Sequence, residues 1–194
     1  PGEEGYDYHG GQARNHDPSK EQVNLILGFP GVGYFHDDFY VETVLSLLLG
    51  SGMSSRLFKE VREKRGLVYT ISSFNQSYRD GGFFGIHAGT GPKLVAELLP
   101  VVADELIKVG DNISDQELSR AKTQARARIL MGMESTSGRC RKLASQILIY
   151  DRPVDQTEII DRVNAVTKQD ILRHANWLFS KKPTLSAVGP LDHL

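Results

Sequence analysis

The sequence predicts a single α+β domain in which helices cover one face of a mostly antiparallel sheet. Segments with the alternating apolar pattern of strands occur in clusters among segments with helical spacing, whereas a parallel α/β fold would alternate strand and helix strictly. The chain has 194 residues, which is enough for one domain with a full core and short for two. We therefore expect one domain over residues 18–194.

Residues 1–17 precede this domain and are rich in Gly, His, Asp and Glu without periodicity. This composition predicts a linker that leads into the domain, with a short strand around Ala13 and Arg14. The first core strand begins near Gln22 and is expected to end at a turn over residues 30–33. Apolar residues alternate along this strand, at Val23, Leu25, Leu27 and Phe29.

Two helices are predicted next. A largely buried one spans residues 36–49, because apolar residues recur there at helical spacing and Gly50 can end it. Ser54 or Ser55 can cap the second helix, and Gly66 can end it. Its inward side chains are expected to be Leu57, Phe58 and Val61. On its exposed side we expect two ion pairs, Lys59 with Glu63 and Glu60 with Lys64.

The rest of the chain predicts a hairpin, further helices and a last strand. Residues 67–74 and 82–88 have strand patterns and are joined by turn formers. Ser114 with Glu117, and Thr167 with Asp170, have the spacing of capping boxes at helix starts. The predicted helices span residues 94–106, 114–133, 138–149, 156–163 and 167–179, and the last strand spans residues 184–188.

The composition excludes several classes of protein. Lys and Arg number 23 against 24 Asp and Glu, so electrostatics favour neither nucleic acid nor an anionic membrane as a partner. No apolar run approaches the roughly 20 residues of a membrane-spanning helix. Cys140 is the only cysteine, which excludes an internal disulfide framework and favours a reducing compartment, cytoplasmic or like the mitochondrial matrix. Because the chain starts at Pro1 without a methionine, we expect a fragment or a processed piece.

No residue pattern in the chain supports catalysis by itself. None of the six histidines fits the H-E-x-x-H or H-x-x-E-H spacing of a catalytic zinc site. The best metal candidate is His36-Asp37-Asp38, but adjacent residues point in different directions around a helix, so we interpret it as a polar helix start and expect no metal in this chain. Ser54 and Ser55 lack the G-x-S-x-G spacing of a nucleophile, and the glycine-rich turns match no nucleotide-binding motif.

Arg62 and Tyr69 are the two side chains that could act on a peptide together. Arg62 lies about one helical turn, or ~5 Å, before Gly66, and Tyr69 lies three strand residues, or ~10 Å, after it. The two converge if the strand runs back along the helix, and a guanidinium and a phenol can then bind the carbonyls and charges of a peptide. Each residue also has a simpler interpretation, Arg62 as a solvated helix arginine and Tyr69 as a strand aromatic in the core.

The segment over residues 50–69, G-S-G-M-S-S-R-L-F-K-E-V-R-E-K-R-G-L-V-Y, resembles the C-terminal half of the pitrilysin and mitochondrial-processing-peptidase family of zinc metallopeptidases. Similar matches extend over nearly the whole chain. They include Y-H-G-G-Q-A-R from residue 8, L-G-F from residue 27, G-F-F-G-I-H-A-G-T from residue 82, V-T-K-Q-D-I from residue 166 and A-V-G-P from residue 187. The resemblance implies a two-half clamshell, in which an N-terminal half carries zinc and its H-x-x-E-H motif and a C-terminal half closes over the peptide.

For this chain the resemblance implies a zinc-free half that is inactive alone. Its partners would be the zinc-binding N-terminal half, on the same chain or a separate one, and a peptide substrate. In relatives, the residues matching Arg62 and Tyr69 reach the partner's active site, where the phenol can bond the oxyanion and the guanidinium holds the substrate. The loop matching Gly50, Ser51 and Gly52 is associated with substrate handling in the processing peptidase's noncatalytic subunit. Here it is short, so substrate binding by these three residues stands beside a simpler interpretation as a turn.

A second function within the same family is also open, namely a noncatalytic subunit that serves as a scaffold or holds peptides. The presence of both Arg62 and Tyr69 favours the peptidase. Asn24 stands where several relatives have a histidine, which disfavours a metal in this half. A homodimer of the isolated chain is also conceivable, through the surface that would otherwise face the zinc half.

Overall fold

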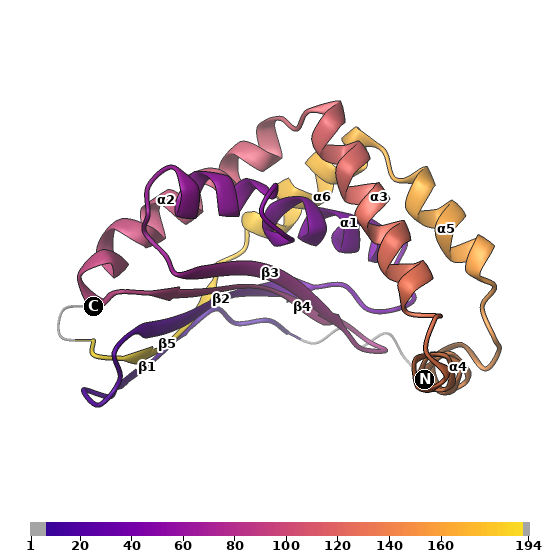
Figure 1. The fold of residues 1–194 in the computed structure, drawn as a ribbon, viewed down its shortest axis with the longest axis horizontal. Coiled ribbons are helices and arrows are strands. Elements are labelled where there is room, and N and C mark those ends of the chain that lie inside the picture. The colour runs from indigo at the N-terminus through magenta and orange to yellow at the C-terminus, as the bar shows by residue number, and fades with distance from the viewer. Residues whose placement is uncertain (1–6, 192–194) are drawn as a thin grey trace.

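A five-stranded sheet forms one layer of the molecule and helices form the other (Figure 1). The computed structural model describes residues 7–191. The strand order is β1-β5-β2-β4-β3, and every neighbouring pair is antiparallel except β1 with β5. The strands are β1 (Gln12–His16), β2 (Val23–Gly31), β3 (Thr70–Ser77), β4 (Gly82–Thr90) and β5 (Thr184–Gly189). The predicted α+β fold class is confirmed.

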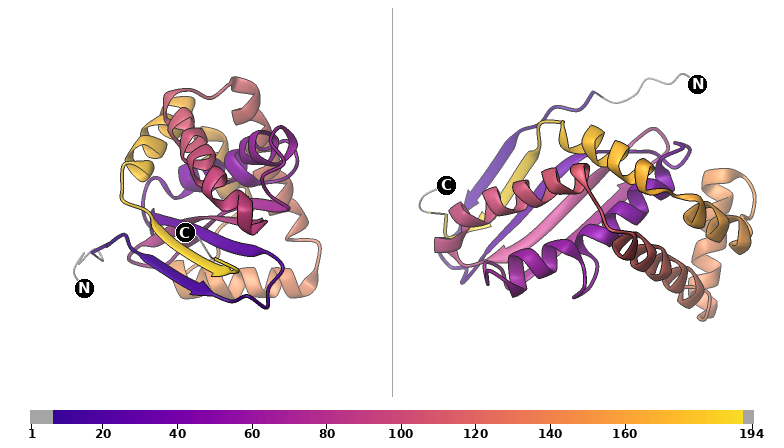
Figure 2. Two further views of the ribbon diagram at one scale, coloured as in Figure 1. Left: turned by 90° about the vertical axis from the view of Figure 1, so that its left-hand side faces the viewer. Right: turned by 90° about the horizontal axis from the view of Figure 1, so that it is seen from above.

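The helices lie over one face of the sheet, except α4, which stands at one end of the sheet (Figures 1 and 2). They are α1 (Phe39–Gly50), the π-helix η1 (Phe58–Glu63), the short 3₁₀ helix η2 (Pro92–Leu94), α2 (Val95–Asp111), α3 (Asp115–Met131), α4 (Thr136–Tyr150), α5 (Gln156–Ala165) and α6 (Lys168–Phe179). Within residues 7–191, no helix is both long and apolar enough to cross a membrane.

The core lies between the sheet and α1. Alternate residues of β2, from Val23 onward, are buried beneath the helices, as the apolar alternation predicts. Helix α1 is apolar on nearly all sides, so it occupies the centre of the helical layer and packs on β3, α3 and α6.

Most predicted elements are confirmed, and several boundaries differ. Strand β1 confirms the short strand around Ala13, and its pairing with β5 makes this part of the predicted linker an edge of the sheet. Residues 1–6 of that linker lie outside the described residues. The predicted turn at residues 30–33 begins too early, because β2 continues to Gly31 in pairing with β4. Both capping boxes, at Ser114 and at Thr167, are present.

The helix after Gly52 differs from its prediction. It contains a π-helical turn, in which the amide of Lys64 donates to the carbonyl of Lys59, five residues earlier. Ser55 stands directly before the first helical residue, Arg56, as a cap would, but its hydroxyl donates to the Gly52 carbonyl at 2.7 Å, and within residues 7–191 no capping hydrogen bond to it is found. The predicted ion pair of Glu60 with Lys64 is present.

A buried polar network joins the helical layer to the loop after β2. Glu42 of α1 is 0% exposed, and its carboxylate accepts from the amide of Val32 at 3.2 Å and contacts Nε2 of His174 at 3.0 Å. Nδ1 of His174 lies 3.4 Å from a carboxylate oxygen of Asp38. Arg173 donates to Asp38 at 2.8 Å, and this hydrogen bond is the main reason why the pKa of Asp38 lies below its usual value. The network fixes the start of α1 against α6.

We predict that Asp38→Asn lowers the free energy of unfolding by about 2 kcal/mol near neutral pH, because a nearly buried charged partner is lost. The folded-state pKa of Asp38 is lower than the unfolded-state pKa, so its contribution is complete above the unfolded-state pKa and disappears as pH falls through the folded-state pKa. Urea unfolding of the wild type and of Asp38→Asn at a series of acidic pH values should show the difference in their unfolding free energies shrink as the pH falls. Asp37→Asn, at an exposed neighbour, is the control and should match the wild type. A gap that does not change with pH would contradict this role of Asp38.

Gly50 is expected to be irreplaceable at the end of α1. A Cβ added to this glycine would overlap the backbone and side chain of Ser73 in β3, so Gly50→Ala must push the helix away from the sheet. We expect a loss of about 2 kcal/mol or more in unfolding free energy. Gly11→Ala is the control, because nothing lies within 4 Å of its added Cβ. Equal stability of the two variants in urea unfolding would show that α1 and β3 are not tightly packed at Gly50.

Candidate functional site

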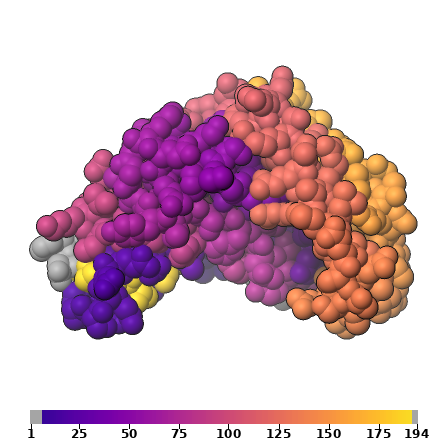
Figure 3. All heavy atoms as spheres, viewed as in Figure 1, coloured from indigo at the N-terminus to yellow at the C-terminus, as the bar shows by residue number. Residues whose placement is uncertain are grey.

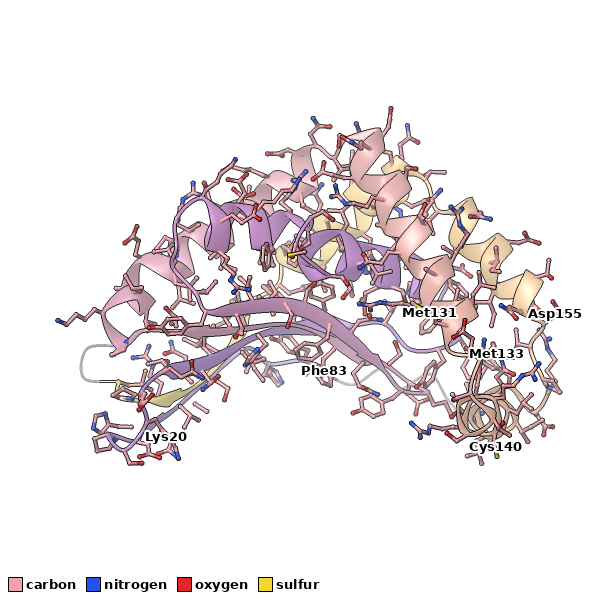
Figure 4. All side chains as sticks on the ribbon, viewed as in Figure 1. Lys20, Phe83, Met131, Met133, Cys140 and Asp155 are labelled. Atoms are coloured by element: carbon pink, nitrogen blue, oxygen red, sulfur yellow. The ribbon has the colours of Figure 1, made fainter. Side chains whose placement is uncertain are left out.

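One face of the sheet is open, and the candidate site lies at its end. The molecule is hollowed on this side, between the loop after β1 and helix α4 (Figure 3). Exposed residues of β2 and β4, among them Asn24, Ile26 and Phe83, alternate with the buried ones and therefore point to this face. Phe83 lies beneath the sheet in Figure 4, on the side away from the main helical layer.

Tyr69 lies beside a groove of about 710 Å³ at one end of this face. The other lining residues are Asn24 and the loop from Ser19 to Gln22. The Tyr69 side chain is 58% exposed, so the interpretation as a core aromatic is wrong. Within residues 7–191, the phenol oxygen has no hydrogen-bond partner, which leaves it able to donate to a ligand.

The backbone around Tyr69 explains why its ring is exposed. Gly66 adopts a left-handed φ of 63° and turns the chain out of η1. Leu67 and Val68 are buried and anchor the following residues, and the Leu67 carbonyl accepts a hydrogen bond from the Thr90 hydroxyl at 2.5 Å. The amide of Tyr69 donates to the carbonyl of Gly89 at 2.8 Å. The ring therefore lies at the end of β4 and not above the core.

Gly89 is opposed by two residues at this point. Its carbonyl bonds the Tyr69 amide, while the sheet register pairs it with Thr70. Two residues against one is the arrangement of a β-bulge, which re-aims side chains near the end of a strand. Strand β3 thus begins at Thr70 and not at residue 67 as predicted.

Three polar side chains meet above Gly89, and two of them, Asn24 and Gln22, line the groove. A Cβ on Gly89 would lie 2.8 Å from Thr70 Oγ1, 3.5 Å from Asn24 Oδ1 and 3.6 Å from Gln22 Oε1. These groups, with the Tyr69 phenol, offer both donors and acceptors to a polar chain such as a peptide backbone. Lys20 and Glu21 at the rim have opposite charges, so the groove has no strong bias toward one sign of ligand.

Arg62 lies on the exposed side of η1, away from the residues that line the groove. Its guanidinium stacks over the ring of Phe58, 4.9 Å from the ring centre. Lys64 and Arg65 both bond Glu60, whereas Arg62 has no carboxylate partner within residues 7–191. No contact joins Arg62 to Tyr69 in the described chain, so the predicted convergence stays a prediction.

Gly50, Ser51 and Gly52 have structural contacts that the sequence did not reveal. The hydroxyl of Ser51 accepts hydrogen bonds from Gln124 at 2.9 Å and Arg128 at 2.6 Å, which ties the turn to α3. Gly50 and Ser51 are buried, and only Gly52 is exposed. Substrate binding by these three residues stays a prediction, and among them only Gly52 is open to a ligand.

The groove residues Ser19 to Gln22 and Asn24 are not predicted as site residues from the sequence. One signal was present in the sequence, because Asn24 interrupts an apolar strand at a position that must face away from the core. Its proximity to Tyr69 follows from the sheet order, which sequence spacing does not give. Within residues 7–191, no group of three or more His, Cys, Asp or Glu side chains could hold a metal ion.

Comparison with known proteins gives concordant results. The Peptidase M16 inactive domain family matches residues 3–125. An uncharacterized zinc protease of Streptomyces coelicolor is 36% identical over 172 residues, which cover 88% of this chain and 38% of the relative. The alpha subunit of the human mitochondrial-processing peptidase is 28% identical over 188 residues, which cover 91% of this chain and 36% of the subunit.

A solved structure supports the same assignment. The crystal structure of a protease from Helicobacter pylori aligns with a TM-score of 0.83 and 26% identity, over 93% of this chain and 44% of that one. The chain thus spans less than half the length of the relatives it matches. The match to the family model extends over more than half of the chain, and it includes η1, Arg62 and Tyr69. The chain therefore belongs to the peptidase M16 family, as an inactive domain of that family.

Proposed function

We propose that this chain is the non-zinc half of a zinc endopeptidase, which closes over an extended peptide and brings Tyr69 and Arg62 to it. The observation that carries the proposal is the unpartnered phenol of Tyr69, exposed beside a groove lined by polar residues. The described residues of this chain do not fit a zinc ion. Zinc and the residues that bind it would therefore belong to the other half, and this chain alone should be inactive.

The groove suits an extended peptide. Its lining offers amide and hydroxyl groups, which can bond the carbonyl and amide groups of an extended main chain. The open sheet face continues from it, with exposed apolar side chains such as Ile26 and Phe83. A peptide on this face would be enclosed once a second half covered it, and exclusion of water strengthens each hydrogen bond formed there.

Tyr69 would contribute to the chemical step by donating a hydrogen bond. When water adds to a peptide carbonyl, negative charge develops on the oxygen, and a positioned donor stabilises this charge more than it stabilises the ground state. The Tyr69 hydroxyl is able to donate, because no group in residues 7–191 occupies it. The backbone amide of Tyr69 is fixed by its hydrogen bond to the Gly89 carbonyl, so the side chain projects from a defined position.

Arg62 would bind the substrate and take no direct part in bond cleavage. Lys64 and Arg65 are paired with Glu60, whereas Arg62 and Lys59 have no carboxylate partner within residues 7–191, so the Arg62 guanidinium is available for a substrate carbonyl or carboxylate. Stacking on Phe58 limits the rotamers of its long side chain before the substrate arrives.

Tyr69→Phe should lower kcat for peptide hydrolysis by a factor of about ten or more, because one donor to the developing oxyanion is lost. The assay pairs this chain with the H-x-x-E-H half from the same organism and measures kcat and KM on an extended fluorogenic peptide. Tyr78→Phe is the matched control, since Tyr78 has a similar exposure of 57% and lies outside the groove. An unchanged kcat for Tyr69→Phe would show that Tyr69 is not a donor to the oxyanion. Pairing without any hydrolysis by the wild type would favour a scaffold or peptide-holding subunit.

Arg62→Gln should raise KM about tenfold and change kcat less. The reason is that a charge-assisted hydrogen bond is lost equally from the bound substrate and from the transition state. Arg65→Gln is the control, because Arg65 lies in the turn just after η1 and is paired with Glu60, and this variant should keep the wild-type KM. If both substitutions give the same small change, Arg62 is an ordinary solvated arginine of the helix.

A further inference from the structure

Helix α4 exposes an apolar surface that the rest of the described chain does not cover. Among its 15 residues, only Gln146 is buried. Leu148 is 83% exposed, and Leu143 and Ile147 are exposed as well. The helix stands apart from the other helices at the end of the sheet (Figure 2).

The two sides of α4 differ in what they contact. Within residues 7–191, the hydrogen bonds and ring contacts of α4 side chains with the rest of the chain lie near the C-terminal end of the helix. There the Gln146 amide exchanges two hydrogen bonds with the backbone of Val154, and the ring of Tyr150 packs against Phe35 at 5.5 Å. The outer side repeats apolar or small residues at helical spacing. These residues, which we call the outer stripe, are Cys140, Leu143, Ala144, Ile147 and Leu148, and all five are exposed.

Within residues 7–191, no other segment covers the outer stripe. A helix of this length is only marginally stable in water unless another surface packs on it. Apolar residues at this spacing normally face a core. Leu130 and Met131, at the end of α3, are further exposed apolar residues on the chain segment that leads to α4. A continuous apolar stripe with this exposure is typical of a surface that another protein covers.

We propose that the outer stripe of α4 docks on the zinc-binding half of the peptidase. This inference rests on the proposed function, because it takes that half as the partner. Relatives carry much more chain than this one: the match covers 44% of the Helicobacter pylori protease and 38% of the Streptomyces relative. Helix α4 borders the hollowed side of the molecule, so a second half that closes over the open sheet face meets α4 at its edge (Figures 1 and 3).

The charges beside the stripe define the partner surface further. Arg139, Arg141 and Lys142 lie in the first half of α4, and no carboxylate of residues 7–191 pairs with them. The complementary surface on the zinc half is therefore an apolar strip bordered by Asp or Glu side chains. Cys140 lies among these cations, at the outer edge of α4 in Figure 4.

The test compares Leu148→Glu and Ile147→Glu with Ile107→Glu. Ile107 is a matched control, because it is 63% exposed and lies on α2, away from α4. Binding of each variant to the H-x-x-E-H half from the same organism is measured by calorimetry. We expect each α4 substitution to raise Kd by about tenfold or more and the control to change it less than about twofold. Arg141→Glu should also weaken binding, and added salt should reduce that difference.

The variants must fold for the result to count. Because the side chains are exposed, far-UV circular dichroism and urea midpoints should match the wild type. Hydrogen exchange gives an independent readout in the unaltered chain: α4 amides should exchange fast in the chain alone and become protected when the zinc half is added.

Each outcome separates this inference from the proposed function. If the zinc half binds the α4 variants as tightly as the wild type, and α4 gains no protection, the docking surface is elsewhere and the proposed function stands. If Leu148→Glu weakens binding while Tyr69→Phe does not alter turnover, the docking surface stands and the role of Tyr69 falls. No binding by the wild type overturns both. A dimer of this chain that Leu148→Glu dissociates, with binding to the zinc half unaffected, would assign the stripe to a second copy and overturn the inference.

Discussion

The burial of α1 is the constraint on which the rest of the structure depends. This helix is apolar on nearly every side and must be enclosed by β3, α3 and α6. Gly50 lets its last turn touch the backbone of β3, and the network of Glu42, His174 and Asp38 holds its first turn against α6. Because α1 and the other helices of the layer cover one face of the sheet, the opposite face stays exposed to solvent.

The position of Tyr69 follows from the same packing. Leu67 and Val68 are drawn into the core, so the chain must pass close to the end of β4, and the two-to-one pairing with Gly89 then turns the aromatic ring outward. Tyr69 thus lies on a segment that is anchored in the core and bonded to the sheet. Precise placement of a hydrogen-bond donor requires such support, because a donor on a mobile loop would lose much of its effect.

The local features of the fold could be predicted from sequence, and the long-range features could not. Capping boxes at Ser114 and Thr167 depend on residues three apart, and the β2 alternation depends on residues two apart, so both are visible in the chain. Tyr69 and Asn24 are brought together by the order of the strands, which local spacing does not encode. Helical spacing predicted α4 as well, but spacing does not say which surface a helix meets, so its exposure became visible only in the structure.

The π-helical turn of η1 has a consequence for how this segment can vary. A π-turn holds one residue more than an α-turn, so it behaves as a one-residue insertion within a helix. Loss of a residue between Phe58 and Arg62 would remove the π-turn and leave a regular α-helix. Because the π-turn already accommodates the extra residue, the chain after it would keep nearly the same orientation, whereas loss of a residue from a regular α-helix would rotate everything that follows by about 100° about the helix axis. This segment can therefore shorten by one residue while the chain still leaves the helix in the same direction toward Tyr69.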